Sequence, residues 1–252
     1  MLSDRSGDVA VVTLNRPAAY NAVGTQLLTD LGAALDACSG DAHAIVLAGE
    51  GRHFCVGADL VEVWSAFGNE GRIRSFLTLF HQIADAIAAS PVPVIAAVQG
   101  FALAGGLELA LACDLIVAAD NAEFGDQHIN VGLIPGGGGS QRLPRAIGTR
   151  RSLALQLTGD RIDAQHALSW GLVHSVHPAA ALLENAVELA MRIATRSREA
   201  VRRMRELSRV ASTRPLDQGL PIELATAVAH MSSSDLPDAL RRFTGREQKK
   251  EE

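Results

Sequence analysis

Glu108 is the residue whose surroundings point most directly to chemistry. It is the single charged side chain in the segment LAGGLELALAC, which spans residues 103–113. A carboxyl group in a dry pocket has a tunable pKa and can act as a general base. An acid at this place can also stabilise the start of a helix electrostatically. The segment therefore predicts either a general base or a helix-capping acid at position 108.

Two turns rich in small residues offer a way to bind a negatively charged oxygen. An expected strand at 44–48 leads into GEGRHFCVGADL (49–60), and another at 94–98 leads into QGFALAGGLEL (99–109). Where a strand hands over to a helix, backbone N–H groups lack partners and small residues let a ligand approach them. Two such turns together give two donors to one oxygen of an enolate or a tetrahedral intermediate. Each can equally be an ordinary tight turn.

The composition narrows the possible chemistry. Lys249 and Lys250 are the two lysines among 252 residues, which excludes a Schiff-base lysine, a pyridoxal phosphate anchor and a phosphate-loop lysine. The net charge of −5 and the 4% aromatic content argue against a nucleic-acid partner. Three widely spaced cysteines predict no metal site and no disulfide framework, and they favour a reducing, cytoplasmic compartment. The uncharged stretch 86–107 is interrupted by Pro and Gly, so no membrane segment is expected.

Strand and helix patterns alternate in the first part of the chain. Apolar, mostly β-branched runs predict strands at 9–14, 44–48, 94–98 and 115–117. Helical patterns cover 25–37, 72–89 and 107–113, and later 152–157, 164–170, 179–196, 199–210, 216–231 and 237–243. Such alternation predicts an α/β fold with a largely parallel sheet. We expect an α/β core at residues 1–190 and a helical region at 191–252, in which the arginines of 192–209 face solvent.

Several consecutive motifs identify a family. The chain resembles the enoyl-CoA hydratase/isomerase family, the crotonase superfamily, over about residues 9–175. The matching segments are LNRPAAYNAV, FCVGADL, AAVQGFALAGGLELALACDLIVAAD, FGDQHINVGLIPGGGGSQRLPR and LTGDRIDAQHALSWGLV. The resemblance implies a spiral of ββα units followed by C-terminal helices that build a homotrimer or a dimer of trimers. It also implies an acyl-CoA thioester as substrate.

The resemblance assigns roles to individual residues. The backbone N–H groups of Ala58 and Gly105 would bind the thioester oxygen, and Glu108 matches the first catalytic glutamate of the family's hydratases. The second glutamate belongs to a stretch like F-G-Q-P-E, where this chain reads F-G-D-Q-H and places His128. A histidine can donate or accept the same proton. Alternatively, His128 is only a polar wall residue. Asp126 is a weaker candidate for the missing acid, or it orients His128 through a ring N–H.

The resemblance also implies where coenzyme A is held. Ala19 and Tyr20 stand where relatives often carry a Lys or Arg near the CoA phosphates, so any cationic contact must come from an arginine, such as Arg16 or Arg52. The residues expected to contact the acyl-CoA are Arg16, Ala18, Ala58, Asp59, Leu60, Gly105, Gly106, Pro135, Gly136, Phe243 and Arg246. The glycine run 136–139 is expected to open a helix and to shape the floor of the acyl pocket. The walls of that pocket are expected to come from residues 62–75 and the C-terminal helices.

The leading hypothesis is an enoyl-CoA hydratase that adds water to a 2-enoyl-CoA without a metal or redox cofactor. Glu108 would activate water for attack at the β-carbon, and His128 would deliver a proton to the α-carbon. The change from glutamate to histidine leaves isomerisation or hydrolysis open as alternatives. A non-catalytic acyl-CoA-binding subunit is a further alternative from a different class of protein.

Overall fold

The structure is a computed structural model and describes residues 1–233. The chain divides into two compact units, Met1–Arg192 and Ile193–Glu252. The expected division between residues 190 and 191 lies inside a helix, α8 (Leu182–Ala194). The expected helix at 237–243 and the expected CoA contacts Phe243 and Arg246 lie outside the described residues.

Six strands form the main sheet of the first unit, in the order β1-β2-β3-β4-β6-β9. They are β1 Leu2–Ser6, β2 Val9–Leu14, β3 Ala44–Gly49, β4 Val94–Val98, β6 Leu115–Ala119 and β9 Ser175–His177. β1 and β2 are antiparallel, and every other neighbouring pair is parallel. The α/β fold with a largely parallel sheet is therefore confirmed. The sequence did not predict β1, because its residues LSDRS form no apolar run.

A second, small sheet was also not predicted. It contains β5 (Phe101–Leu103), β7 (Glu123–Gly125) and β8 (Ile162–Asp163), in the order β5-β7-β8. Each strand is too short to show a periodic pattern. This sheet matters for the site, since β5 runs toward Gly105 and β7 ends one residue before Asp126.

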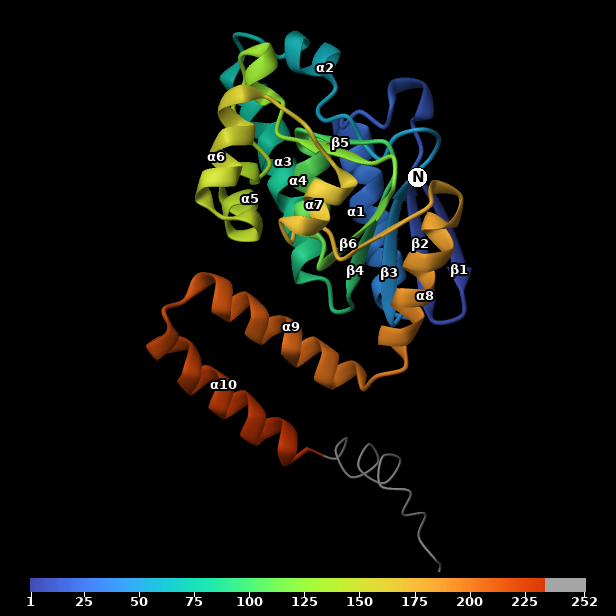
Figure 1. Cartoon of the computed structure of the whole chain (residues 1–252), viewed down its shortest axis with the longest axis vertical. Coiled ribbons are helices and arrows are strands. Elements are labelled where there is room, and N and C mark those ends of the chain that lie inside the picture. The colour runs from blue at the N-terminus through green and yellow to red at the C-terminus, as the bar shows by residue number, and fades with distance from the viewer. Residues whose placement is uncertain (234–252) are drawn as a thin grey trace, which may run out of the picture. The chain divides into compact units, whose positions relative to one another are not determined.

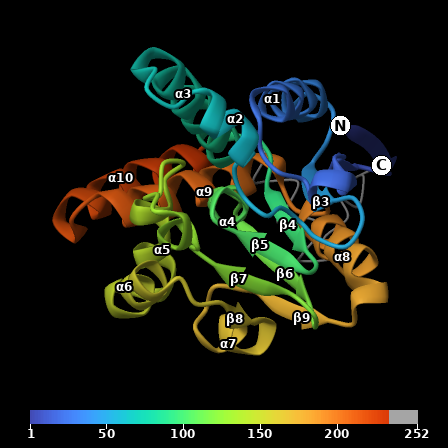
Figure 2. The same ribbon diagram turned by 90° about the horizontal axis from the view of Figure 1, so that it is seen from above.

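Helices cover the main sheet and flank the small one (Figures 1 and 2). They are α1 Thr25–Ser39, α2 Leu60–Ser65, α3 Glu70–Ala89, α4 Gly105–Ala112, α5 Gly139–Ile147, α6 Thr149–Thr158, α7 Ala164–Ser169 and α8, with 3-10 turns at Pro17–Ala19, His128–Val131 and Ala179–Ala181. α1 packs against α3, and α4 packs against both α3 and α5. α2 was not predicted. It begins where Asp59 accepts hydrogen bonds from the N–H groups of Val61 and Glu62.

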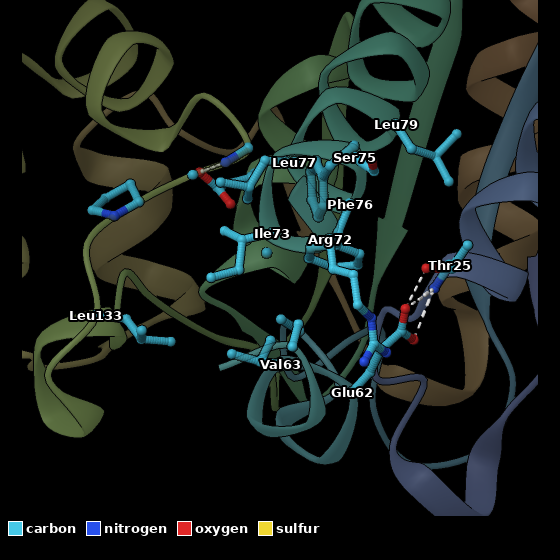
Figure 3. Close-up of a pocket in the computed structure, with 18 of the residues that line it drawn as sticks. Thr25, Glu62, Val63, Arg72, Ile73, Ser75, Phe76, Leu77, Leu79 and Leu133 are labelled. Carbon is cyan, nitrogen blue, oxygen red and sulfur yellow. Dashed lines mark hydrogen bonds between the residues drawn. The ribbon is translucent and has the colours of Figure 1, made fainter. Parts of the chain in front are cut away.

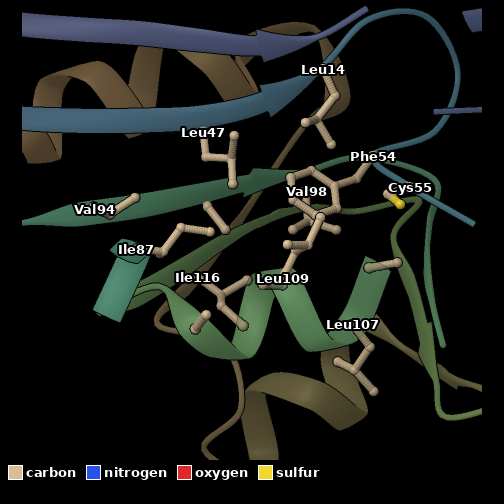
Figure 4. Packing of buried hydrophobic residues seen from close by; sticks show 14 of the residues in the cluster. Leu14, Leu47, Phe54, Cys55, Ile87, Val94, Val98, Leu107, Leu109 and Ile116 are labelled. Carbon is tan, nitrogen blue, oxygen red and sulfur yellow. The ribbon is translucent and has the colours of Figure 1, made fainter. Parts of the chain in front are cut away.

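The hydrophobic core lies between the main sheet and the helices beside it (Figure 4). Leu47, Val98 and Phe54 are fully buried there, and Leu109 points toward them from α4, whereas Leu107 is buried on the other side of that helix. Nearly all of α4 is buried, which is unusual for a helix that carries an acid. A charged group on this helix therefore lies in a region of low polarity.

The second unit is described by α9 (Arg198–Thr213) and α10 (Leu216–Met231), which lie side by side (Figure 1). Neither helix contains a buried residue. On α9, Glu199 accepts hydrogen bonds from Arg202 and Arg203, and these bonds lower the pKa of Glu199 to about 2. The arginines of α9 were expected to face solvent, but Arg202 and Arg203 are half-buried, and Arg203 also donates to the Thr226 carbonyl of α10 at 3.1 Å. Within residues 1–233, no helix combines the length and the apolar character needed to cross a bilayer.

Candidate active site

A cavity of about 790 Å³ lies in the first unit, bounded by α2, α3, the start of α4 and the loop before α5 (Figure 3). Six of the site residues expected from the sequence line it together: Ala58, Gly105, Glu108, His128, Pro135 and Gly136. They come from four separate segments of the chain. The fold therefore brings the predicted catalytic residues to one place.

The first of the two turns places the Ala58 N–H at the cavity. Val23 N–H donates to the Gly57 carbonyl and Asp59 N–H donates to the Val23 carbonyl, both at 2.8 Å, and these bonds fix the backbone on each side of Ala58. Gly57 has a φ of +107°, a conformation that favours glycine. The Ala58 N–H itself donates to no group within residues 1–233.

The second turn places the Gly105 N–H beside it. Ala104 has the rare backbone angles φ 47° and ψ −118°, and its N–H donates to the Gly125 carbonyl at 2.9 Å. A Cβ built on Gly57 would lie 3.3 Å from the Gly105 nitrogen, so the two turns are in contact. In the described part of the chain the Gly105 N–H also has no acceptor. Two adjacent, unpartnered N–H groups are what a developing oxyanion requires.

Glu108 is held at the cavity by backbone groups. Its side chain is 3% exposed, and Oε1 accepts hydrogen bonds from the N–H groups of Gly137 (2.8 Å) and Gly139 (2.7 Å). Burial raises the pKa of Glu108, although these two bonds and the nearby His128 act in the opposite direction. Arg142 steadies the glycine loop by donating to the Gly137 carbonyl at 3.0 Å. Because Oε1 is occupied by two donors, Oε2 is the oxygen left to exchange a proton.

The glycine run was expected to open a helix and to shape the pocket floor. α5 does begin at Gly139, and Gly136 and Gly137 line the cavity. The hydrogen bonds from the glycine run to the Glu108 carboxylate were not predicted, because the residue type does not indicate where a backbone N–H donates.

His128 lies opposite the free oxygen of Glu108. Its Nε2 is 3.8 Å from Glu108 Oε2, and its Nδ1 is 2.8 Å from Asp126 Oδ1. The side chains of His128 and Asp126 are 10% and 3% exposed. Burial lowers the pKa of His128, but the hydrogen bond to Asp126 and the charges of Glu108 and Asp126 outweigh it, so the pKa is raised overall.

The segment that carries His128 is anchored outside the cavity. Gln127 has a positive φ of 56°, and its side-chain amide donates to the Gly159 carbonyl. Asn130 donates to the same carbonyl at 3.1 Å. These contacts hold the short 3-10 turn that begins at His128.

The remaining expected contacts lie elsewhere. Arg16 forms an ion pair with Asp59 at 3.0 Å, which lowers the pKa of that carboxyl, and both line a separate hollow of about 300 Å³. Leu60 is exposed on α2, and Ala18 lies in the 3-10 turn Pro17–Ala19. Gly106 is buried against Cys55. None of these five residues is among those that line the large cavity. Their part in binding coenzyme A stays a prediction.

Arg52 lies at yet another place. It lines a cavity of about 580 Å³ together with His53 and Gln99, beyond the ends of the main-sheet strands. His53 stacks on Phe101 with 4.3 Å between ring centroids, and burial lowers its pKa. The suggested contact of Arg52 with CoA phosphates likewise stays a prediction.

Residues of the wall expected at 62–75 do line the main cavity, and α3 extends this wall beyond Ser75. Val63, Ile73, Leu77 and Leu133 point into the same space in Figure 3. The apolar wall residues on α3 are Ile73, Phe76, Leu77, Leu79 and Phe80. Their helical spacing marks one apolar face, which could have been found from the periodicity. At the other end of the cavity lie three polar residues, Thr25, Glu62 and Arg72, of which Thr25 lies outside the expected wall.

The arrangement defines an enzyme class by its chemistry. Two backbone N–H groups can stabilise negative charge on a substrate oxygen, while a buried carboxylate and an imidazole can move protons beside it. The adjoining wall is apolar and suits a hydrocarbon chain. Such a site fits reactions that pass through an enolate-like oxygen.

Comparison with known proteins identifies the family. The family model described as enoyl-CoA hydratase/isomerase matches residues 4–251. A probable enoyl-CoA hydratase of Rhizobium meliloti is 39% identical over 98% of this chain and 95% of its own length. The mitochondrial enoyl-CoA hydratase of Pongo abelii is 35% identical over 95% of this chain and 82% of its own length.

Solved structures agree with the sequence comparison. The crystal structure of an enoyl-CoA hydratase from Bacillus anthracis superposes with a TM-score of 0.91 at 36% identity, covering 97% of this chain and 95% of that one. DspI of Pseudomonas aeruginosa also gives a TM-score of 0.91, at 31% identity, covering 97% of this chain and 93% of that one. The chain belongs to the enoyl-CoA hydratase/isomerase family, within the crotonase superfamily, whose members act on acyl-CoA thioesters. The fold and family expected from the sequence are confirmed.

Proposed function

We propose that this enzyme is an enoyl-CoA hydratase, which adds water across the double bond of a 2-enoyl-CoA to give a 3-hydroxyacyl-CoA. The observation that carries the proposal is the placement of Glu108 Oε2 and His128 Nε2 3.8 Å apart in the cavity that the Ala58 and Gly105 amides also line. The relatives named above as hydratases support the same reaction.

The proposed reaction uses each group once. The thioester oxygen accepts hydrogen bonds from the Ala58 and Gly105 N–H groups. Glu108 Oε2 takes a proton from water as the water oxygen bonds to the β-carbon, and the double-bond electrons move onto the thioester as an enolate. The protonated His128 then gives its Nε2 proton to the α-carbon. A proton passing from Glu108 Oε2 to His128 Nε2 restores both groups.

General magnitudes give the expected contribution of each group to the rate. An oxyanion donor contributes about 10²–10³-fold to the rate. A general acid or base contributes about 10²–10⁴-fold when its pKa is near the working pH. The raised pKa of Glu108 brings this carboxyl closer to neutrality than an exposed one. Coenzyme A enters only as part of the thioester, and the proposed mechanism uses no metal or redox cofactor.

The test is the hydration of crotonyl-CoA by the purified full-length chain, followed by loss of the absorbance of the conjugated double bond. Glu108→Gln should lower kcat by at least about 10²-fold. Glu188→Gln, an exposed acid on α8, is the matched control and should leave kcat unchanged. Equal activity of Glu108→Gln and the wild type would remove Glu108 from the mechanism.

Product analysis separates the alternatives. Conversion of 3-enoyl-CoA without hydration would indicate an isomerase, and release of free CoA thiol from a 3-ketoacyl-CoA or an acyl-CoA would indicate a hydrolase. Tight binding of several acyl-CoA lengths without turnover would indicate a non-catalytic binding subunit. Each of these outcomes would overturn the hydratase proposal.

We also propose that the chain forms a homotrimer or a dimer of trimers. Leu216, Leu220, Leu224 and Val228 are exposed at four-residue intervals on α10, which places them along one stripe of the helix. Such a stripe indicates a surface that another copy covers. Sedimentation equilibrium of the full-length chain should give three or six times the monomer mass of 26.5 kDa.

A further inference from the structure

Asp126 is a buried acid for which the proposed reaction has no direct use. It follows β7 and is 3% exposed, and its Oδ1 lies 2.8 Å from His128 Nδ1. An ionised carboxylate is retained in such a place only when a donor satisfies it. Here the donor is the imidazole that faces the substrate cavity.

The contact decides which ring nitrogen carries the mobile proton. An ionised Asp126 has no proton to give, so Nδ1 must be the donor of this hydrogen bond. The other nitrogen, Nε2, then exchanges its proton on the cavity side, where it lies 3.8 Å from Glu108 Oε2. Without Asp126 the ring could turn, or the proton could move to the other nitrogen.

The charged groups around His128 are few. Within residues 1–233, the two ionisable residues that shift the pKa of His128 are Asp126 and Glu108, and both are acids. Glu108 is fixed by backbone donors, whereas His128 depends on one side chain. The orientation of the imidazole therefore depends on a single residue, Asp126.

The chain departs from the family motif that the resemblance implies at three places, and two of these are the residues of this contact, Asp126 and His128. Where the family pattern reads F-G-Q-P-E, this chain reads F-G-D-Q-H, so an amide and a carboxylate become a carboxylate and an imidazole. Each new side chain suits the other, because a carboxylate is an acceptor for the ring N–H. Changing either residue alone would leave the other without this partner.

We propose that Asp126 is a positioning residue of this enzyme: its hydrogen bond to Nδ1 holds the His128 ring with Nε2 toward Glu108, so that Asp126 and His128 act as one unit. The proposal rests on the proposed role of His128 as proton donor. Asp126 touches neither the substrate nor the reacting atoms.

The kinetic test is Asp126→Asn, which keeps the size of the side chain but removes its charge. We expect kcat for crotonyl-CoA hydration to fall by at least about 10²-fold, with KM changed by less than about threefold. The basic limb of the kcat–pH profile should move to lower pH, because the pKa of His128 loses the carboxylate that raises it. An unchanged kcat and pH profile in the folded variant would overturn the proposal.

Asp163→Asn is a matched control. Asp163 Oδ1 makes the same 2.8 Å contact with a ring Nδ1, that of His166, but on the exposed start of α7. Asn is as good a helix N-cap as Asp, so the fold should persist. This variant should keep the wild-type kcat and pH profile. An equal loss of activity in both variants would show that the effect of Asp126→Asn is not specific to the site.

A double variant tests the unit directly. Asp126→Gln and His128→Glu should each lower kcat, and the two together, which restore the family pattern at these places, should recover activity above either single variant. Additive losses in the double variant would contradict the coupling.

The ring itself gives a readout that does not need turnover. Nitrogen-15 NMR of the full-length chain, with the His128 signals assigned from His128→Gln, should show the neutral ring protonated at Nδ1. A neutral ring protonated at Nε2 would overturn the proposal even if Asp126→Asn does not fold. If the NMR result is as expected and hydration is absent, the positioning role stands and the proposed reaction fails.

Discussion

The functional groups on the two sides of the cavity have different origins, backbone amides on one side and side chains on the other. On one side, the backbone supplies the functional groups: the Ala58 and Gly105 amides, and the Gly137 and Gly139 amides that hold Glu108. On the other side, side chains do so: Asp126 holds His128. Apolar side chains of α3, such as Ile73, form the adjoining wall.

This difference between the two sides predicts which substitutions each side tolerates. A backbone amide is present whatever the residue type, so the backbone side is sensitive mainly to added volume or altered φ and ψ. A side-chain contact disappears with one substitution. The backbone side should therefore fail through glycine substitutions, and the other side through loss of individual groups.

The largest effect on activity is expected from Gly105→Ala. A Cβ there would lie 3.5 Å from the Ala58 nitrogen and 3.2 Å from the Phe80 ring, which is tight but not an overlap. It would occupy the space between the two oxyanion donors. We expect kcat/KM to fall by about 10²–10³-fold with little change in Tm. A wild-type rate measured on crotonyl-CoA would show that the oxygen binds elsewhere.

Substitution of the next residue, Gly106, should instead lower the stability of the protein. A Cβ on Gly106 would overlap the Cys55 carbonyl oxygen and lie 2.7 Å from the Cys55 carbonyl carbon, both fixed backbone atoms. Gly106→Ala should lower the free energy of unfolding by about 3 kcal/mol, the upper part of the usual range for overpacking. Urea denaturation followed by circular dichroism measures this. Gly40→Ala is the control, because within residues 1–233 no atom beyond its chain neighbours lies within 4 Å of its Cβ position. Equal midpoints for the two variants would contradict the close packing.

On the side-chain side, Ile73→Trp should change substrate preference rather than stability. Ile73 is partly exposed and lines the apolar wall, so a larger ring would displace the far end of a long acyl chain. Excluding two methylenes costs about 1.6 kcal/mol, or about 15-fold in kcat/KM. The measurement compares a twelve-carbon enoyl-CoA with crotonyl-CoA, whose kcat/KM should stay the same. A uniform loss for both lengths would place Ile73 outside the acyl path.

The smallest effect is a gain in stability for Glu108→Gln. Burial raises the pKa of Glu108 above its ordinary value of 4.5, so the stabilising contribution of the neutral carboxyl is present below that value. It is lost as pH rises through the raised pKa. At pH 7 the glutamine variant should therefore be more stable than the wild type by about 0.5–2 kcal/mol.

The difference between the two proteins should shrink as pH falls, because more of the wild-type carboxyl is then neutral. Urea midpoints at pH 7 and pH 5 check both parts of this expectation. A glutamine variant that is less stable than the wild type at pH 7 would mean that the attraction of His128 stabilises the Glu108 carboxylate by more than burial destabilises it.

Much of the fold could be predicted because long buried strands and helices leave periodic patterns. β2 and β4 begin and end at the predicted residues, and α10 does as well. The short strands β5 and β7 could not be found, since three residues show no period. They form through pairing between distant segments, which one segment alone does not reveal.

The candidate site divides in the same way. Glu108 stood out as an acid in an apolar helix, and the resemblance to the family pointed to Ala58, Gly105 and His128. The hydrogen bonds of Gly137 to Glu108 could not be predicted, because any residue has an N–H and only the folded chain shows where it points. That Asp126 bonds to His128 was one of two possibilities, and only the 2.8 Å contact distinguishes them.

The small sheet has a consequence for how the reaction can diverge among relatives. Its β5–β7 ladder pairs Leu103 with Gly125, so the Ala104–Gly105 turn and Asp126 both begin where the ladder ends. Residues 126 and 128 can then be exchanged without rebuilding the turn that carries the oxyanion donor. The scaffold therefore separates the proton-transfer groups from the turn that stabilises the enolate, so that each can change independently of the other.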